Sequence, residues 1–395
     1  MPSPPAFRHD PRKSVLCLPS APVPTSCWER EPAVCGLDRL VHHDGAGHAT
    51  AVPVSSSPAV VTGAGVVFAA GDGTVRFYDR ELSKVFWRQR LDSPVYASLV
   101  VDAERRHVVV AATSGLVVCF DLRGSVVWST ETGVPVYATP TRLPGSDVLM
   151  IAAFTSRAIG LDLATGVILF DRAVPRPWHA EHGGSAAHRD PYASPVATAN
   201  GTAVLACGEH ALCLAPDGTE LWRHDLGVAV KASPVAIHET GDVMMCPVDG
   251  RCVFMDSATG SERGHTRLGA KVIGSPAVSE GVVVAGTQHG TVTAFDADAR
   301  AVRWTAPFGA SREYTSFTVL PNGDFAATST RGNIVALRRA DGGFLWETTQ
   351  VLGLVEHETA MDITPVVGPD GSMYCASYTG SIYHFRFQPT REEDQ

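Results

Sequence analysis

The sequence predicts an all-β protein, an eight-bladed β-propeller of four-stranded blades, and three observations carry this prediction. A hydroxyl residue recurs eight times, at separations of 39 to 55 residues, each time ahead of an apolar β-branched run. A tight hairpin turn recurs with the same period, and an aromatic residue marks the last strand of most units. About forty residues suffice for four short strands and their turns, and such units bury their faces by stacking radially.

The recurring positions define the blades in order. The hydroxyl residues, which we name anchors, are Ser57, Ser98, Thr139, Ser194, Ser233, Ser275, Ser316 and Thr364. The hairpin turns lie at 71–73, 113–115, 155–157, 208–210, 248–250, 288–290, 330–332 and 378–380. The aromatic residues of the outer strands are Trp87, Trp128, Phe170, Trp222, Trp304 and Trp346. Because each of the eight anchors is followed by one turn, the sequence predicts eight blades.

The two ends of the repeat region predict how the ring closes. The last unit ends after residues 380–387 without a tryptophan strand, whereas an unassigned Trp28 precedes the first anchor. We therefore expect an N-terminal strand around Trp28 to complete the last blade, which removes an exposed sheet edge. The expected organisation is one propeller over residues 27–388, a flexible proline-rich extension over 1–26 and a polar tail over 389–395.

Composition excludes several classes of protein. The net charge of −9 argues against a surface that binds nucleic acid. No run of about 18 apolar residues is long enough to span a membrane, and the N-terminus lacks the pattern of a secretory signal. The nine cysteines show no CxxC spacing, so we expect reduced thiols in a cytoplasmic protein. Cys246 and Cys252 flank one hairpin and are expected to be small buried strand residues.

Three units, at residues 56–79, 232–260 and 274–304, resemble the pyrroloquinoline-quinone-type propeller repeat. This repeat is shared by quinoprotein alcohol dehydrogenases, an outer-membrane assembly lipoprotein and cytoplasmic relatives, and the resemblance extends over residues 27–388. The resemblance implies the propeller fold, but the dehydrogenases use adjacent cysteines beside the quinone and a calcium site. Because this chain has no adjacent cysteines, we expect neither quinone-dependent oxidation nor a bound cofactor.

A ring of side chains is predicted two residues before each anchor. Side chains of a strand alternate between its two sides, so these residues and the anchors point the same way and surround one mouth of the central channel. The ring positions are Ser55, Tyr96, Tyr137, Tyr192, Lys231, Ile273, Tyr314 and Asp362. Tyrosine and lysine on consecutive blades form a wall suited to an aromatic or amphipathic ligand. The alternative is that the tyrosines pack between blades and that the charged residues lie solvated at the rim.

Three links between blades are longer than the rest, at residues 28–57, 170–194 and 346–364. They occupy the same topological position, so they are expected on the same face as the ring. Their histidines are His42, His43, His48, His179, His182, His188 and His357. Imidazole groups over a pocket could ligate a divalent metal or act as acid and base near neutral pH, or they could simply be solvated.

Together these groups predict a small-molecule pocket at one channel mouth. The expected activity is acid–base catalysis, such as cyclisation, elimination or hydrolysis, on an aromatic or amphipathic metabolite. The candidate catalytic residues are Lys231, Asp362, Tyr192, His182 and His179. The candidate substrate-binding residues are Tyr96, Tyr137, Tyr314, Trp178 and His357. The alternative is a non-catalytic scaffold that binds a peptide or protein on the same face. Neither hypothesis includes a nucleic acid or a membrane as partner. Whether the loop histidines bind a divalent metal is left open.

Overall fold

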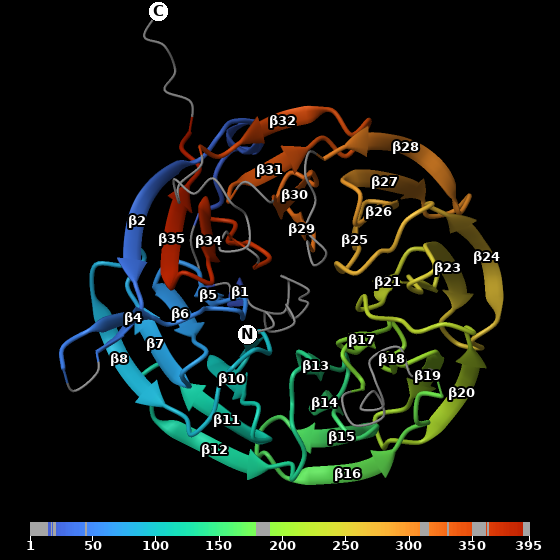
Figure 1. The fold of residues 1–395 in the computed structure, drawn as a ribbon, viewed down its shortest axis with the longest axis horizontal. Helices are drawn as coiled ribbons and strands as arrows, with labels where there is room; N and C mark the ends of the chain where they lie inside the picture. The colour runs from blue at the N-terminus through green and yellow to red at the C-terminus, as the bar shows by residue number, and fades with distance from the viewer. Residues whose placement is uncertain are drawn as a thin grey trace, which may run out of the picture.

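Eight β-sheets stand radially around a central axis and form the blades of a propeller (Figure 1). This computed structural model describes residues 15–16, 18, 21–43, 46–178, 190–308, 316–329, 332–349, 361 and 363–389. Within these residues the secondary structure is almost entirely strand, with the short 3-10 helix η2 (Thr25–Glu29) near the N-terminus. The predicted all-β, eight-bladed architecture is therefore confirmed.

The first four blades follow one another along the chain, and each is ordered from the innermost strand to the outermost. Blade 1 contains β5 (Ala59–Val61), β6 (Gly65–Ala69), β7 (Thr74–Tyr78) and β8 (Val85–Arg90). Blade 2 contains β9 (Val100–Asp102), β10 (His107–Ala111), β11 (Leu116–Asp121) and β12 (Val126–Glu131). Blade 3 contains β13 (Thr141–Arg142), β14 (Val148–Ala153), β15 (Arg157–Asp162) and β16 (Ile168–Ala173). Blade 4 contains β17 (Val196–Ala197), β18 (Ala203–Cys207), β19 (His210–Leu214) and β20 (Glu220–Asp225).

The remaining blades continue the same order, except that the last one takes its outermost strand from the N-terminal region. Blade 5 contains β21 (Val235–Ile237), β22 (Asp242–Met245), β23 (Arg251–Asp256) and β24 (Glu262–Arg267). Blade 6 contains β25 (Ala277–Ser279), β26 (Val282–Gly286), β27 (Thr291–Asp296) and β28 (Ala301–Pro307). Blade 7 contains β29 (Thr318–Val319), β30 (Phe325–Thr328), β31 (Ile334–Leu337) and β32 (Phe344–Glu347). Blade 8 contains β33 (Val366–Val367), β34 (Ser372–Ala376), β35 (Ser381–Arg386) and β2 (Ala33–Arg39).

The anchors are hydrogen-bond acceptors that join neighbouring blades around the channel. The backbone N–H of Ser57 donates to the Oγ of Ser98 at 3.2 Å, and the N–H of Ser98 donates to the Oγ1 of Thr139 at 3.0 Å. The same bond recurs from Thr139 to Ser194, from Ser194 to Ser233 and from Ser275 to Ser316. A small hydroxyl is needed because it must reach a backbone amide of the preceding blade.

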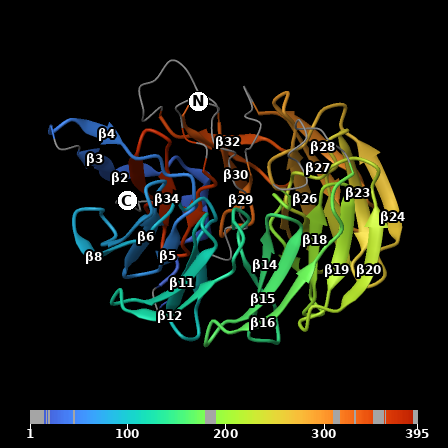
Figure 2. The same cartoon turned by 60° about the horizontal axis from the view of Figure 1, so that its bottom comes forward.

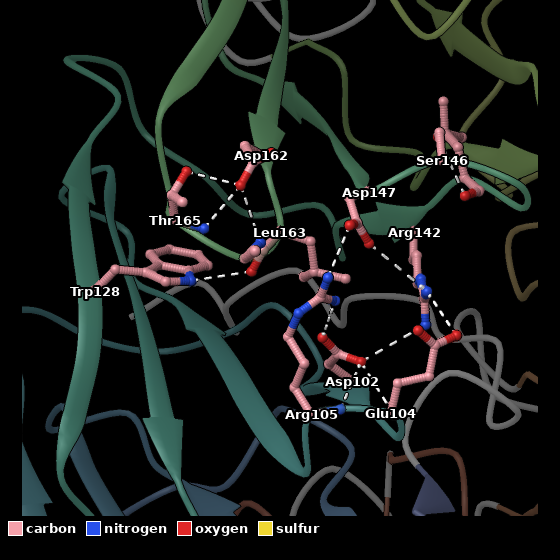
Figure 3. Close-up of polar contacts among 12 residues, drawn as sticks. Asp102, Glu104, Arg105, Trp128, Arg142, Ser146, Asp147, Asp162, Leu163 and Thr165 are labelled. Carbon is pink, nitrogen blue, oxygen red and sulfur yellow. Dashed lines mark hydrogen bonds and ion pairs between the residues drawn. The ribbon is translucent and has the colours of Figure 1, made fainter.

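The outer-strand tryptophans join blades in a second way. The Nε1–H of Trp128 donates to the carbonyl of Leu163 in the next blade at 3.0 Å (Figure 3). Trp87, Trp222 and Trp304 each make the same bond to a carbonyl 35 residues further on. The indole of Trp128 packs on Gly166, where a Cβ would lie 2.5 Å from the ring. The turn therefore needs a glycine at this position for close approach as well as for its φ of 74°.

The ring closes as predicted, although the closing strand lies after Trp28. Strand β2 pairs antiparallel with β35, from Ala33 opposite Arg386 to Arg39 opposite Ser381. Trp28 itself belongs to η2, where it is 1% exposed. Its carbonyl accepts the Nε1–H of Trp346 at 2.8 Å. Trp28 thus replaces the turn carbonyl that the other tryptophans use, because in blade 8 the chain ends interrupt that turn.

Part of the segment expected as a flexible extension belongs to the propeller. Strand β1 (Val15–Leu16) pairs in parallel with β5 and gives blade 1 a fifth strand. The backbone N–H of Thr62 donates to the carbonyl of Leu16 at 2.8 Å, and Leu16 is 1% exposed. Sequence reasoning missed this strand because two residues are too short to show a pattern. The division into 1–26, 27–388 and 389–395 otherwise stays a prediction.

The propeller has two different faces. The links between blades and the hairpins between second and third strands lie on one face, which we name the link face. The turns between third and fourth strands lie on the opposite face, which we name the turn face. The link that runs into blade 1 carries the hairpin of β3 (Val41–His43) and β4 (Ala49–Ala51), which projects from the rim (Figure 2).

Ion pairs reinforce the blade junctions on the turn face. Asp102 of blade 2, whose side chain is fully buried, pairs with Arg105 at 2.8 Å and with Arg142 of blade 3 at 3.6 Å. Arg105 also reaches Asp147 of blade 3 at 2.7 Å (Figure 3). Because a buried carboxylate without a cation is destabilising, this arrangement fixes blade 3 against blade 2.

Candidate functional site

An aromatic row crosses the link face over blades 2 to 4. The rings of Tyr96 and Tyr137 stack at 5.7 Å between centroids, and Tyr137 stacks on Phe154 at 4.4 Å. Phe154 then meets Tyr192 edge to face at 5.3 Å. The three tyrosines come from consecutive links and are half-buried, whereas Phe154 comes from the hairpin of blade 3. The row therefore brings aromatic rings and phenolic groups together on one support.

A group of charged residues lies at the Tyr192 end of this row. The N–H of Ser156, in the hairpin that also carries Phe154, donates to the backbone carbonyl of Asp190 at 2.9 Å. The Asp190 carboxylate accepts a hydrogen bond from the N–H of Gly208 in the hairpin of blade 4. The neighbouring Glu209 has a fully buried side chain. Three separate segments thus bring two carboxylates together beside Lys231.

Burial raises the pKa of the Asp190 carboxyl to about 6. The Lys231 ammonium opposes this rise, the charge of Glu209 adds to it, and the hydrogen bond from Gly208 lowers it again. Desolvation therefore outweighs the nearby cation. Because this pKa lies close to neutrality, the Asp190 carboxyl loses its proton as the pH rises through about 6.

Glu209 fixes the position of Trp178. The backbone N–H of Trp178 donates to the Oε1 of Glu209 at 2.6 Å, and the Nε2 of His210 lies 3.2 Å from the same oxygen. The Trp178 side chain is 58% exposed, which is unusual for an indole. A large aromatic side chain therefore stands at the surface on an ordered backbone.

A separate cavity of about 270 Å³ lies inside the channel. It is lined by the innermost strands of blades 3 to 7, including the anchors Ser194, Ser233 and Ser275, and by Arg142 and His238. None of the described ring residues that we expected around a ligand pocket lines it. The tyrosines pack on each other and on Phe154 of a hairpin instead.

The structure places only some of the predicted site residues. Tyr96, Tyr137 and Tyr192 come together in the row, Lys231 lies near Asp190, and Trp178 is exposed beside Glu209. The residues that fall outside the described part of the chain are Asp362, His179, His182, Tyr314 and His357. Sequence reasoning missed Phe154, Asp190 and Glu209.

The described residues contain no group of three or more histidine, cysteine, aspartate or glutamate side chains placed to hold a metal ion. This applies to His42, His43 and His48, which lie on or beside the β3 and β4 hairpin. The remaining loop histidines, His179, His182, His188 and His357, are not described. The expectation that no cofactor is bound stays a prediction.

The fold and its repeats define the chain as a propeller of the pyrroloquinoline-quinone-type repeat class. A family model described as outer membrane protein assembly factor BamB matches residues 27–215 and 209–393. The two matches together cover most of the sequence, so the chain belongs to this family.

One curated relative is the outer membrane protein assembly factor BamB of Yersinia pestis, which is 25% identical over 209 residues. That match covers 46% of this chain and 51% of the relative, so it spans about half of the relative's length. The crystal structure of BamB from Moraxella catarrhalis has a TM-score of 0.67 at 16% identity, over 90% of this chain and all of that one. The computationally designed Ika8 protein has a TM-score of 0.66 at 17% identity, with the same coverage of both chains. These two structures show the fold alone.

The family corrects two expectations. The prediction of an acid–base enzyme is wrong, because the family is described as a protein assembly factor, and this favours the scaffold alternative. The individual roles predicted for Lys231, Asp362, Tyr192, His182 and His179 stay untested predictions. The cytoplasmic location is also wrong, because the same description refers to the outer membrane. Within the described residues, no helix has the length and apolar character to cross a membrane.

Proposed function

We propose that this chain is a non-catalytic scaffold that binds a protein partner through its link face. The aromatic row of Tyr96, Tyr137, Phe154 and Tyr192 is the observation that carries this proposal. Tyrosine and tryptophan are enriched at the centres of protein interfaces, because they bury much area at a small cost in side-chain entropy. The exposed Trp178 extends the same type of surface.

The aromatic row is suited to a partner because the anchors beneath it are bonded to one another. Each tyrosine of the row lies two residues from an anchor, and the anchors are bonded from blade to blade. Side chains that are already held in place lose less conformational entropy when a partner binds. The row therefore supports binding of a peptide or protein segment without rearrangement of the blades.

The relatives suggest the process in which such a scaffold takes part. They are named as assembly factors of outer membrane proteins, and we extend this role to the chain. The partner class is then a protein that acts in this assembly or passes through it. A scaffold needs no catalytic group, which agrees with a row whose tyrosines pack on one another.

The test introduces a photoreactive amino acid at Trp178 in cells that produce the chain, with Phe344 as the matched position. Phe344 is 59% exposed on the outer strand of blade 7, away from the link face. We expect cross-links to a defined protein from position 178 and none from position 344. The cross-linked protein is then identified by mass spectrometry and produced for binding measurements.

Binding of that partner is compared between the wild type, Tyr137→Ala and Tyr137→Phe. Tyr137 is the middle ring of the row, so its truncation is expected to weaken binding by about 30-fold or more, as at an interface hot spot. Tyr137→Phe keeps the stacking ring and is expected to bind nearly as well as the wild type. Equal affinity of Tyr137→Ala and wild type, or cross-links from position 344 only, would contradict the proposal.

A further inference from the structure

Two cysteines face each other across the hairpin of blade 5. Met245 pairs with Val253 as the last pair of the ladder of β22 and β23, and Cys246 and Cys252 are the residues next to that pair towards the turn. Their Sγ atoms are 3.7 Å apart. Directly opposed residues of an antiparallel pair have Cα atoms about 4.5–5.5 Å apart, which lies within the range of disulfide-bonded cysteines.

We propose that Cys246 and Cys252 form an intrachain disulfide in the mature protein. The expectation of reduced thiols depended on a cytoplasmic location, which the family contradicts. Disulfides form and persist in the oxidising compartments outside the cytoplasm. The inference rests on the envelope location that goes with the proposed function, but not on the partner-binding row.

The reaction needs a disulfide oxidant, such as oxidised glutathione or a dithiol-disulfide oxidoreductase. The thiolate of one cysteine attacks the oxidant and forms a mixed disulfide, which releases one thiol of the oxidant. The second cysteine then attacks the mixed disulfide, forms the Cys246–Cys252 bond and releases the other thiol. Two protein thiols are oxidised, one oxidant disulfide is reduced to two thiols, and the two protons pass to those leaving thiolates.

Oxidation precedes the burial of the hairpin. Cys246 is 1% exposed and Cys252 is fully buried, so an oxidant does not reach them in the folded blade. The hydrogen bond with Cys246 raises the pKa of the Cys252 thiol, and burial raises it further. Because the thiolate is the reacting form, the pair reacts while blade 5 is still open. Only five residues separate the two cysteines, so they meet early in folding.

The disulfide would brace a hairpin that contacts the link face. Pro247, beside Cys246, bridges to Val230 of the link into blade 5, and the N–H of Val248 donates to the carbonyl of Ala229 at 2.9 Å. This link also carries Lys231. The covalent bond therefore holds the turn at residues 247–250 in the position where it supports the link.

Peptide mapping of the full chain tests the proposal. The chain is unfolded and reduced, refolded with a mixture of oxidised and reduced glutathione, then denatured, alkylated and digested with trypsin. Cleavage after Arg251 separates the two cysteines, so a disulfide joins peptides 232–251 and 252–263. We expect this joined pair, with a mass about 2 Da below the sum of the two reduced peptides, because a two-electron oxidation removes two hydrogens.

Two variants and one further sample sharpen the result. Cys375→Ser removes another buried cysteine and is expected to keep the joined pair, whereas Cys246→Ser is expected to lose it. Protein taken directly from the source cells, with thiols blocked at lysis, is expected to show the same pair. Separate, fully alkylated peptides from both the refolded wild type and the cellular protein would overturn the inference. That result leaves the loss of partner binding in Tyr137→Ala unaffected, so the two proposals fail separately.

Discussion

At the scale of single residues, the notable feature is the burial of two carboxylates beside Lys231. Asp190 has a pKa of about 6 because burial disfavours its charged form more than Lys231 favours it. Glu209 is fully buried, and its carboxylate holds the backbone of Trp178. Above pH 6 the folded protein therefore keeps a charge at Asp190 that is partly uncompensated.

Asp190→Asn should stabilise the protein at neutral pH. The folded pKa of about 6 exceeds the value of 3.8 in an unperturbed aspartate, so the folded state binds more protons than the unfolded chain between these values. The free energy of unfolding of the wild type therefore falls as the pH rises from about 4 to 6. We expect Asp190→Asn to gain on the order of 1–2 kcal/mol at pH 7.5 and little at pH 4. Urea unfolding at both pH values measures this.

The matched control is Asp298→Asn, which changes an exposed carboxylate on the turn face. Because the side chain is exposed, this substitution should change the free energy of unfolding by less than about 0.5 kcal/mol. A gain for Asp190→Asn that is the same at pH 4 and pH 7.5 would show that Asp190 is not the group that titrates.

The sequence could predict the tyrosines of the site but not their charged neighbours. Tyr96, Tyr137 and Tyr192 repeat at a fixed offset from the anchors, so the period alone brings them together. Phe154 and Glu209 lie at hairpins, which the sequence marks only as turns. Their position on the link face follows only once the hairpins of the second and third strands are known to lie there.

At the scale of elements, the tryptophan strands explain why one pattern repeats through the chain. Each indole N–H needs a carbonyl from the next blade, and each turn needs a glycine under the indole. The sequence predicted strand and turn from this pattern, but it placed the closing strand at Trp28. Trp28 lies in a 3-10 helix, where its carbonyl accepts the Nε1–H of Trp346. The closing strand β2 begins only at Ala33.

Trp346→Phe tests whether Trp28 replaces a turn. The substitution leaves the carbonyl of Trp28 without its donor, so we expect a loss of about 1–3 kcal/mol in the free energy of unfolding. Trp304→Phe removes the equivalent bond to the carbonyl of Arg339, which lies in an uninterrupted turn of blade 7. It should lower the free energy of unfolding by a similar amount. Denaturant unfolding measures both. A much smaller loss for Trp346→Phe would mean that the junction at Trp28 contributes little to closure.

At the scale of the whole molecule, one strand closes the ring. Strand β2 covers β35, which would otherwise present the unpaired edge of blade 8. Removal of residues 1–39 is therefore expected to produce larger oligomers or aggregates than the full chain forms, and size-exclusion chromatography with light scattering measures this change.

The control for this truncation shortens the β3 and β4 hairpin. Val41 lies opposite Ala51, so a two-residue Asn-Gly turn can replace residues 42–50 without disturbing the blades. This variant should elute as the full chain does. A truncated chain that elutes as a stable monomer would show that closure does not depend on β2.

The same scale explains why function was harder to predict than fold. Eight anchors and eight turns determine the propeller, and they would do so for any function on it. The titratable groups at the channel mouth suggested catalysis, but Tyr137 packs between two other rings, which the sequence alone does not show.

The pairing of β2 with β35 also has a consequence for synthesis on the ribosome. Arg39 leaves the ribosome long before its partner Ser381, because the 341 residues from 40 to 380 are translated in between. At about 5–20 residues per second, the nascent β2 waits roughly 20–70 s for the strand it must join. During that interval its backbone N–H and C=O groups lack their native partner, so a strand that is made early is among the last to be paired.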